Sequence, residues 1–269
     1  MALAFAALVP YPKKLAQEPE TSDLAKTRAG ILNVKKLIKD NNVDTLIVVS
    51  SHLLQPMHAY STTPGDPAAY YMLGLDKLQT HINQTTSRDK PSVFNNDVEL
   101  IRFIRERARP FSYTMLINPN VKIDEPSSIA LELLEISAAQ KVPAIVSIVL
   151  PYVPPSDLFE FGLFLGRIAK ESDKKIGLIA VGDLSARLSK GSPAGFRREG
   201  KLFDDLVITA AKQNDFMPII TADQALLEKA GESAARPLAV AAGASLGLTA
   251  QVESYEAPNG TGYATLTWS

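Results

Sequence analysis

Apolar runs alternate with amphipathic segments along most of the chain. The runs are short and rich in β-branched residues, which is typical of strands covered on both faces. They cover residues 3–9, 45–51, 112–117, 143–150 and 176–181. Between them, apolar residues recur at helical spacing over residues 22–39, 96–107, 127–140, 157–171 and 201–213. This alternation predicts an α/β fold with a mixed or largely parallel central sheet flanked by helices.

The last third of the chain continues this pattern. A short segment at 217–221, a helix over 222–229 and an alanine-rich helix ending near Gly243 are expected before a final hairpin. Asn259-Gly260 is the turn signal of that hairpin. Ser156 or Asp157 is the expected N-cap of the 157–171 helix. Residues 55–93 show a weaker pattern and are interpreted as insertions around a pocket.

Nothing in the sequence separates two domains. No internal repeat, low-complexity tract or long linker is present, so we expect a single domain over residues 1–269. The apolar start has no basic residues and reaches Pro10 too soon for a signal peptide or a membrane span. We therefore interpret it as the first strand of the core and expect a cytoplasmic protein.

Charge and composition narrow the chemistry. The 28 basic residues nearly balance the 29 acidic ones, which argues against a nucleic-acid or membrane surface and favours a small molecule or another protein as partner. Because the chain has no cysteine, disulfides, Cys-zinc sites and thiol nucleophiles are excluded, and any metal must be held by His, carboxylate or Tyr. Walker, G-x-S-x-G and H-E-x-x-H motifs are also absent.

The run at 176–181 ends at Gly182-Asp183 and gives way to a polar Gly/Ser/Pro segment that lasts until Lys201. A buried strand that ends in small polar residues is where α/β proteins usually place their binding sites. The sequence therefore directs attention to this turn.

The same turn carries a family resemblance. Its residues Gly-Asp-Leu-Ser (182–185), Arg-Leu (187–188), Pro-Ala-Gly (193–195) and Phe-Asp (203–204) resemble the signature of the class III extradiol ring-cleavage dioxygenases, in the family of LigB-like and Memo-like proteins. The resemblance extends over nearly the whole chain. It implies that family's α/β fold and its reaction, the Fe(II)- and O2-dependent cleavage of catechol or aminophenol rings in aromatic compound metabolism.

The resemblance also implies a site at the strand ends. By position, Tyr11, His52 and Glu232 take the places of the family's metal ligands, and Ala186 takes the place of its acid/base histidine. Such a non-haem Fe(II) site is built from two histidines and one carboxylate. Tyr11 and Ala186 therefore both replace an imidazole. The resemblance adds Ser51, Asp183, Ser185 and Ala186 as residues that line the pocket.

Each of the three metal positions has an alternative role. Tyr11 either binds a metal as phenolate or, in the preferred interpretation, fills the pocket and forms hydrogen bonds to Glu232 or His52. The side chain of His52 is a metal ligand or a pocket-lining group. Glu232 is a ligand or a helix-start carboxylate that interacts with the helix dipole or with Arg236.

The other polar residues near the turn also have two interpretations. Asp183 and Ser185 suit a turn because they can bond local backbone amides. The exposed-edge interpretation of Arg187, Arg197 and Arg198 competes with one in which they face an anionic substrate. His58 and His81 have no motif around them and are expected in loops.

Two hypotheses for function follow. The first is a catalytically impaired homologue or pseudoenzyme, a non-catalytic subunit that forms homo- or hetero-oligomers and pairs with a catalytically intact paralogue. The second is an active metal-dependent dioxygenase that uses a variant Tyr11/His52/Glu232 site. Fe(II) is the cofactor that the resemblance implies, with no cofactor as the alternative, and a small aromatic molecule is the implied ligand.

Overall fold

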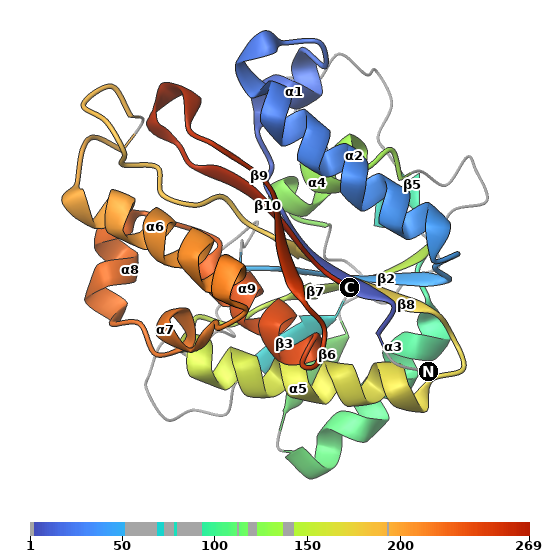
Figure 1. The fold of residues 1–269 in the computed structure, drawn as a ribbon. Helices are drawn as coiled ribbons and strands as arrows, with labels where there is room; N and C mark the ends of the chain where they lie inside the picture. Colours follow the sequence, from blue (N-terminus) through green and yellow to red (C-terminus); the bar gives the residue numbers. More distant parts are fainter. Residues whose placement is uncertain are drawn as a thin grey trace.

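The computed structural model describes residues 3–51, 69–72, 78–79, 93–111, 113–117, 123–136, 143–192 and 194–269. Among these residues, eight strands form one mixed sheet through the middle of the molecule (Figure 1). In spatial order they are β6 (Thr114–Ile117), β3 (Ala69–Met72), β7 (Ala144–Val149), β2 (Thr45–Ser50), β8 (Ile176–Val181), β1 (Phe5–Val9), β10 (Tyr263–Trp268) and β9 (Ala250–Glu256). Two short strands, β4 (Leu78–Gln79) and β5 (Val93–Phe94), pair separately.

The four central strands β7, β2, β8 and β1 run parallel to one another. The strands outside them turn the sheet mixed, because β10 is antiparallel to β1, β9 is antiparallel to β10, and β3 is antiparallel to β7. Almost every residue of the central strands is buried, which explains their near-continuous apolar sequences. The predicted α/β fold is therefore confirmed.

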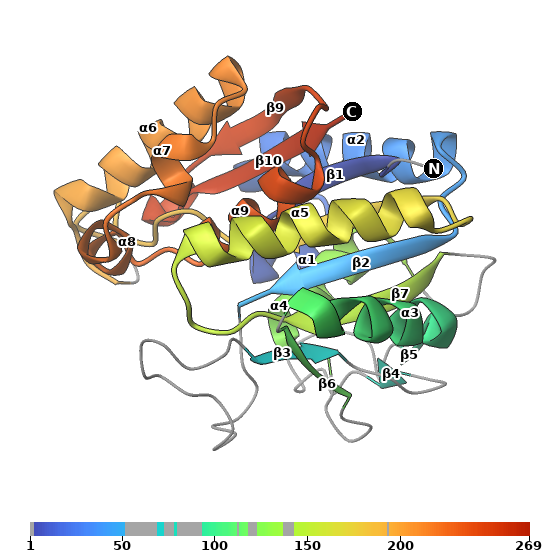
Figure 2. The same ribbon diagram turned by 90° about the horizontal axis from the view of Figure 1, so that it is seen from below.

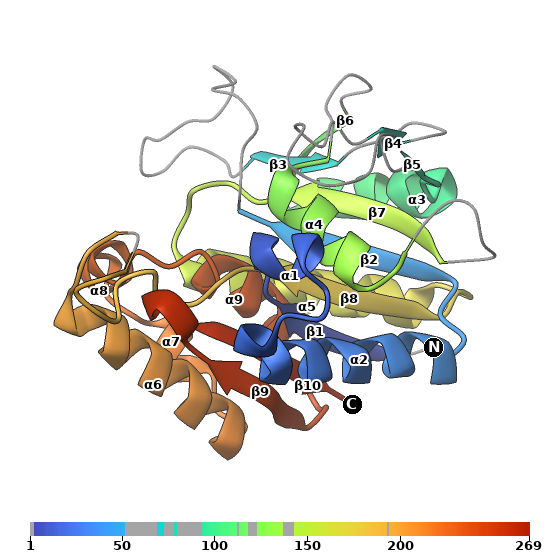
Figure 3. The ribbon, with the colours of Figure 1, turned by 90° about the horizontal axis from the view of Figure 1, so that it is seen from above.

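Helices cover both faces of the sheet (Figures 2 and 3). One face, with inward residues such as Leu8, Val49 and Leu178, packs against α3, α5 and α9. The opposite face, with residues such as Phe5, Val48 and Ile179, packs against α1, α2 and α4. These helices are α1 (Lys13–Gln17), α2 (Ala25–Asp40), α3 (Val98–Ala108), α4 (Glu125–Leu133), α5 (Pro155–Glu171) and α9 (Ala235–Ala244).

The remaining helices lie near the C-terminal hairpin. The longest, α6 (Arg198–Gln213), packs on β9 and on α8 (Gln224–Ala230), while α2 contacts β9 and β10 as well. The short helix α7 (Met217–Ile220) follows α6. Three turns of 3-10 helix complete the described elements, at Ser22–Leu24, Arg109–Phe111 and Pro258–Gly260. In the described part of the chain, no helix is long and apolar enough to cross a membrane.

Helix starts are where the structure departs from the expected elements. Asp97 caps α3 and Asp124 caps α4, each accepting a hydrogen bond from a backbone N–H of the first turn, so α4 begins two residues earlier than predicted. The expected cap at Ser156 or Asp157 is wrong, because α5 begins at Pro155 and has no side-chain cap. A proline fits there since its missing N–H would be unpaired in any case. The predicted hairpin turn is present, with Asn259 in the left-handed region at φ 59°.

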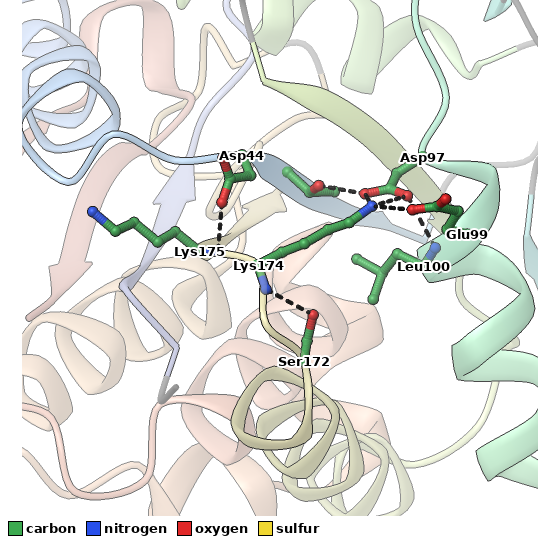
Figure 4. A network of polar contacts seen from close by, with 8 residues as sticks. Asp44, Asp97, Glu99, Leu100, Ser172, Lys174 and Lys175 are labelled. Carbon is green, nitrogen blue, oxygen red and sulfur yellow. Dashed lines mark hydrogen bonds and ion pairs between the residues drawn. The ribbon is translucent and has the colours of Figure 1, made fainter.

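A polar network closes the amino-terminal edge of the parallel strands (Figure 4). The Lys174 ammonium lies 2.7 Å from both carboxylate oxygens of buried Asp97 and 3.2 Å from Glu99. Asp97 also accepts hydrogen bonds from the Thr45 hydroxyl at 2.5 Å and from the Leu100 N–H at 2.9 Å. Burial opposes ionisation of Asp97, but these donors outweigh it and lower its pKa. The buried charge is thus fully matched.

Removing the cation tests the value of this match. We expect Lys174→Met to lower the free energy of unfolding by about 1–3 kcal/mol at neutral pH, because it leaves a charged acceptor buried without its partner. Since the pKa of Asp97 is lowered on folding, its contribution exists above the unfolded value and disappears as pH falls through the folded value. Urea denaturation should therefore show the loss shrinking in acid. As a control, Lys201→Met removes only an exposed ion pair and should cost about 0.5 kcal/mol or less.

Candidate functional site

The carboxyl ends of β1, β2 and β8 meet at one edge of the sheet, because these strands are parallel and adjacent. Tyr11, Ser51 and Gly182-Asp183 follow the three strands directly. The segment 230–234, which leads into α9, lies against the same edge, bonded to Asp183 and Ser51. Residues from four separate stretches of sequence are thereby brought together.

Ser233 joins these stretches. Its hydroxyl accepts a hydrogen bond from the Asp183 N–H at 2.9 Å and lies 3.3 Å from the Tyr11 hydroxyl. The Ser233 N–H donates to the Asp183 carbonyl at 3.1 Å, and the Ser51 hydroxyl donates to the Ser233 carbonyl at 3.3 Å. One serine therefore cross-links the ends of three strands.

Gly182 allows this approach. A Cβ atom at Gly182 would lie 2.6 Å from the Ala234 Cα and 2.7 Å from the Ser233 carbonyl oxygen, closer than real Cβ contacts. Only glycine lets the backbone of β8 come so near the start of α9.

Asp183 is a carboxylate with little compensation. Its Oδ1 accepts the Tyr11 N–H at 2.9 Å. Burial raises the pKa of Asp183 to about 7, opposed only by that hydrogen bond. Burial, together with the charge of Asp183, also raises the pKa of Tyr11 and brings the pKa of Tyr263 to about 12. Both phenols are therefore neutral hydrogen-bond donors at physiological pH.

Glu232 stands at the start of α9. Its Oε2 accepts the Ala235 N–H at 2.6 Å. Burial raises the pKa of Glu232 to about 7, while the helix N–H groups and the nearby charge of Arg236 favour the ionised form. These contacts support the helix-start alternative for Glu232. Arg236 itself donates to the Val153 carbonyl at 3.0 Å and stacks over the Tyr152 ring at 3.8 Å.

Ser185 and Ala186 extend the contact between the two segments. The Ser185 hydroxyl donates to the Ala230 carbonyl at 2.7 Å, and the Ala186 N–H donates to the Gly231 carbonyl at 3.3 Å. The Ser185 N–H binds the buried Asp204 carboxylate at 2.9 Å. Burial raises the pKa of Asp204 to about 6. Ser185 thus fixes the loop through its own hydrogen bonds, while Ala186 lies beside the segment that carries Glu232.

The three predicted arginines do not act together. Arg187 donates to the Lys229 carbonyl at 3.4 Å, Arg198 lies 3.6 Å from Glu199, and Arg197 is exposed. His52 lies outside the described residues, as do His58 and His81. The role expected for His52 therefore stays a prediction.

The described residues do not fit the two-histidine, one-carboxylate Fe(II) site that the resemblance implies. Among them, no group of three or more His, Asp or Glu side chains is placed to hold a metal ion. The raised pKa of Tyr11 opposes the phenolate that a metal would need. The Glu232 oxygen Oε2 already accepts a helix N–H.

Two residues of the site were missed from the sequence. Ser233 follows the predicted Glu232, and Tyr263 opens β10 after the expected turn. Neighbourhood to a motif was the only available signal for Ser233. Tyr263 had none, because its proximity to Asp183 depends on how the last strand pairs with β1.

Comparison with known proteins gives a family match over most of the chain. Residues 6–265 match the sequence model of LigB, described as the catalytic LigB subunit of aromatic ring-opening dioxygenase.

Two individual proteins are also similar. Protein CA_C1420 of Clostridium acetobutylicum is 30% identical over 112 residues, a match that covers 41% of this chain and 24% of that protein. This chain thus matches only about a quarter of that relative's length. The crystal structure of the uncharacterized protein JW3007 from Escherichia coli K12 has a TM-score of 0.65 at 14% identity, covering 98% of each chain, and shows that the two share a fold.

Gly182→Ala tests the close approach at this edge. We expect it to lower the free energy of unfolding by about 1–3 kcal/mol, because an overpacked methyl group must push β8 and α9 apart. Gly191→Ala is the matched control, since its Cβ would meet nothing nearer than 4.0 Å, and it should stay within about 0.5 kcal/mol of the parent. Thermal unfolding of both variants measures the difference. Equal melting temperatures would contradict the packing argument.

Asp183→Asn tests the uncompensated carboxylate. Because the pKa of Asp183 is raised on folding, the folded state binds its proton more tightly, and stability falls as pH rises from the unfolded value of 3.8 towards about 7. We expect the variant to lose that part of the decline, since asparagine can still accept the Tyr11 N–H. Chemical denaturation across this pH range measures it. An unchanged slope would show that Asp183 ionises normally in the folded protein.

Proposed function

The chain belongs to the family of the catalytic LigB subunit of aromatic ring-opening dioxygenases, and on that premise we propose that it binds a small aromatic molecule without cleaving its ring. It would be a catalytically impaired member that keeps the family fold and the position of the ligand site at the strand ends.

The observation that carries this proposal is the methyl side chain at Ala186. Ring cleavage of this class needs a group that takes the proton of the ring hydroxyl, usually an imidazole. Ala186 cannot exchange a proton. The nearest described alternatives are occupied, since Ser185 is bonded to Ala230 and Asp204 is bonded to Ser185 and Tyr255.

Tyr11 supports the same conclusion. Its hydroxyl lies 3.3 Å from Ser233, and burial next to Asp183 raises its pKa. A phenol kept neutral is suited to hydrogen bonding and poorly suited to ligation of Fe(II). The substitution thus exchanges a metal-binding imidazole for a group that contributes to a polar pocket.

A non-catalytic family member has a role if it works with a partner. We propose that this chain acts as a subunit, in a homo-oligomer or together with a paralogue that retains the histidines. The family membership and the changes at positions 11 and 186 support this assignment. Co-purification with such a paralogue tests it, and a protein that stays monomeric in its presence would contradict it.

The central test is ring cleavage after anaerobic reconstitution with Fe(II). We expect no catechol-dependent O2 uptake above the rate of the His52→Ala variant. Metal content of the desalted proteins is measured in parallel by mass spectrometry. The double variant Tyr11→His/Ala186→His restores both imidazoles and is expected to bind more iron than the parent.

Near-stoichiometric iron in the parent that is lost in His52→Ala, together with ring-opened product, would contradict the proposal. That result would favour the variant Tyr11/His52/Glu232 site.

A further inference from the structure

The charge of Asp183 has no cationic counterpart among the described residues. Its Oδ1 accepts the Tyr11 N–H, and no described donor reaches its Oδ2. No positive group contributes to its pKa, in contrast to Asp97, whose buried charge is matched by Lys174. A partly buried carboxylate with an unused oxygen is costly unless something else pairs with it.

The groups around Asp183 share its polarity. The phenols of Tyr11 and Tyr263 both lie close enough to be influenced by its charge, and Asp124 adds negative charge near Tyr11. Asp124 is held by hydroxyl donors of Ser50 at 2.7 Å and Ser127 at 2.8 Å, which are neutral. The described part of this edge therefore carries a negative potential next to neutral hydroxyl groups.

The nearest guanidinium groups are committed to other partners. Arg236 is buried, donates to the Val153 carbonyl and stacks on Tyr152. Arg187 donates to the Lys229 carbonyl and packs against Gly231. Neither forms the two-pronged contact by which arginine usually recognises a ligand carboxylate.

We propose that Asp183 is a specificity-determining residue that accepts a hydrogen from a ring hydroxyl or ammonium group and discriminates against aromatic rings that bear a carboxylate. The inference rests on the proposed function, since it assigns the charge class of the ligand at the same site. It follows from electrostatic complementarity, because two like charges brought together in a partly desolvated site repel strongly.

Three catechols that differ in one substituent provide the test. Methylcatechol is neutral, its aminomethyl analogue is cationic, and its carboxylate analogue, protocatechuate, is anionic. Binding to the metal-free full chain is measured by anaerobic calorimetry in mildly alkaline buffer. We expect methylcatechol and the aminomethyl catechol to bind at least about tenfold more tightly than protocatechuate.

Two variants separate recognition from folding. Asp183→Asn keeps an acceptor for the Tyr11 N–H and removes the charge, so the affinity ratio between methylcatechol and protocatechuate should fall to within about threefold. Asp205→Asn removes an exposed carboxylate of α6 that is paired with Lys201, and it should leave the ratio unchanged. If Asp183→Asn does not fold, the order of the three ligands on the parent protein still decides the question.

The outcomes distinguish the two claims. Protocatechuate binding as tightly as methylcatechol would overturn the charge selection alone. Failure of all three catechols to bind would overturn it together with the proposed ring-binding function. Ring cleavage by the iron-loaded protein would contradict the proposed function and leave the order of affinities intact.

Discussion

The close approach of two backbone segments at Gly182 and Ala234 is the constraint on which the site depends. It sets residues 182–186 beside residues 230–234, so that Ser233 reaches Asp183 and Ala186 reaches Gly231. From this position Ser233 also contacts Tyr11 and Ser51, each at the end of another strand. A side chain at Gly182 would separate the segments and dissolve the whole cluster.

The two ends of the parallel strands treat buried charge in opposite ways. At the amino-terminal edge, Asp97 is matched by Lys174, Thr45 and a helix N–H, an arrangement that stabilises the fold. At the carboxyl edge, Asp183 has one backbone donor and no cation among the described residues. A protein tolerates such a mismatch where a ligand can complete it.

Much of the fold could be predicted from the sequence because the central strands are buried on both faces and therefore read as unbroken apolar runs. Helix starts were less predictable. Asp97 and Asp124 act as caps only because tertiary packing sets the chain direction there, whereas the local signal at Ser156 is overridden by Pro155. The candidate site was predictable in its location and incomplete in its members. Parallel strands bring Tyr11, Ser51 and Asp183 to one edge, but Ser233 and Tyr263 reach it through contacts between residues far apart in the sequence, which no local pattern encodes.

A crystal structure of the protein grown anaerobically with Fe(II) and methylcatechol tests the proposed binding mode most directly. We predict a ring hydroxyl within hydrogen-bonding distance of Asp183 Oδ2, with the Tyr11 hydroxyl still beside Ser233. Iron bound by the oxygens of Tyr11 and Glu232, with the catechol on the metal, would contradict it.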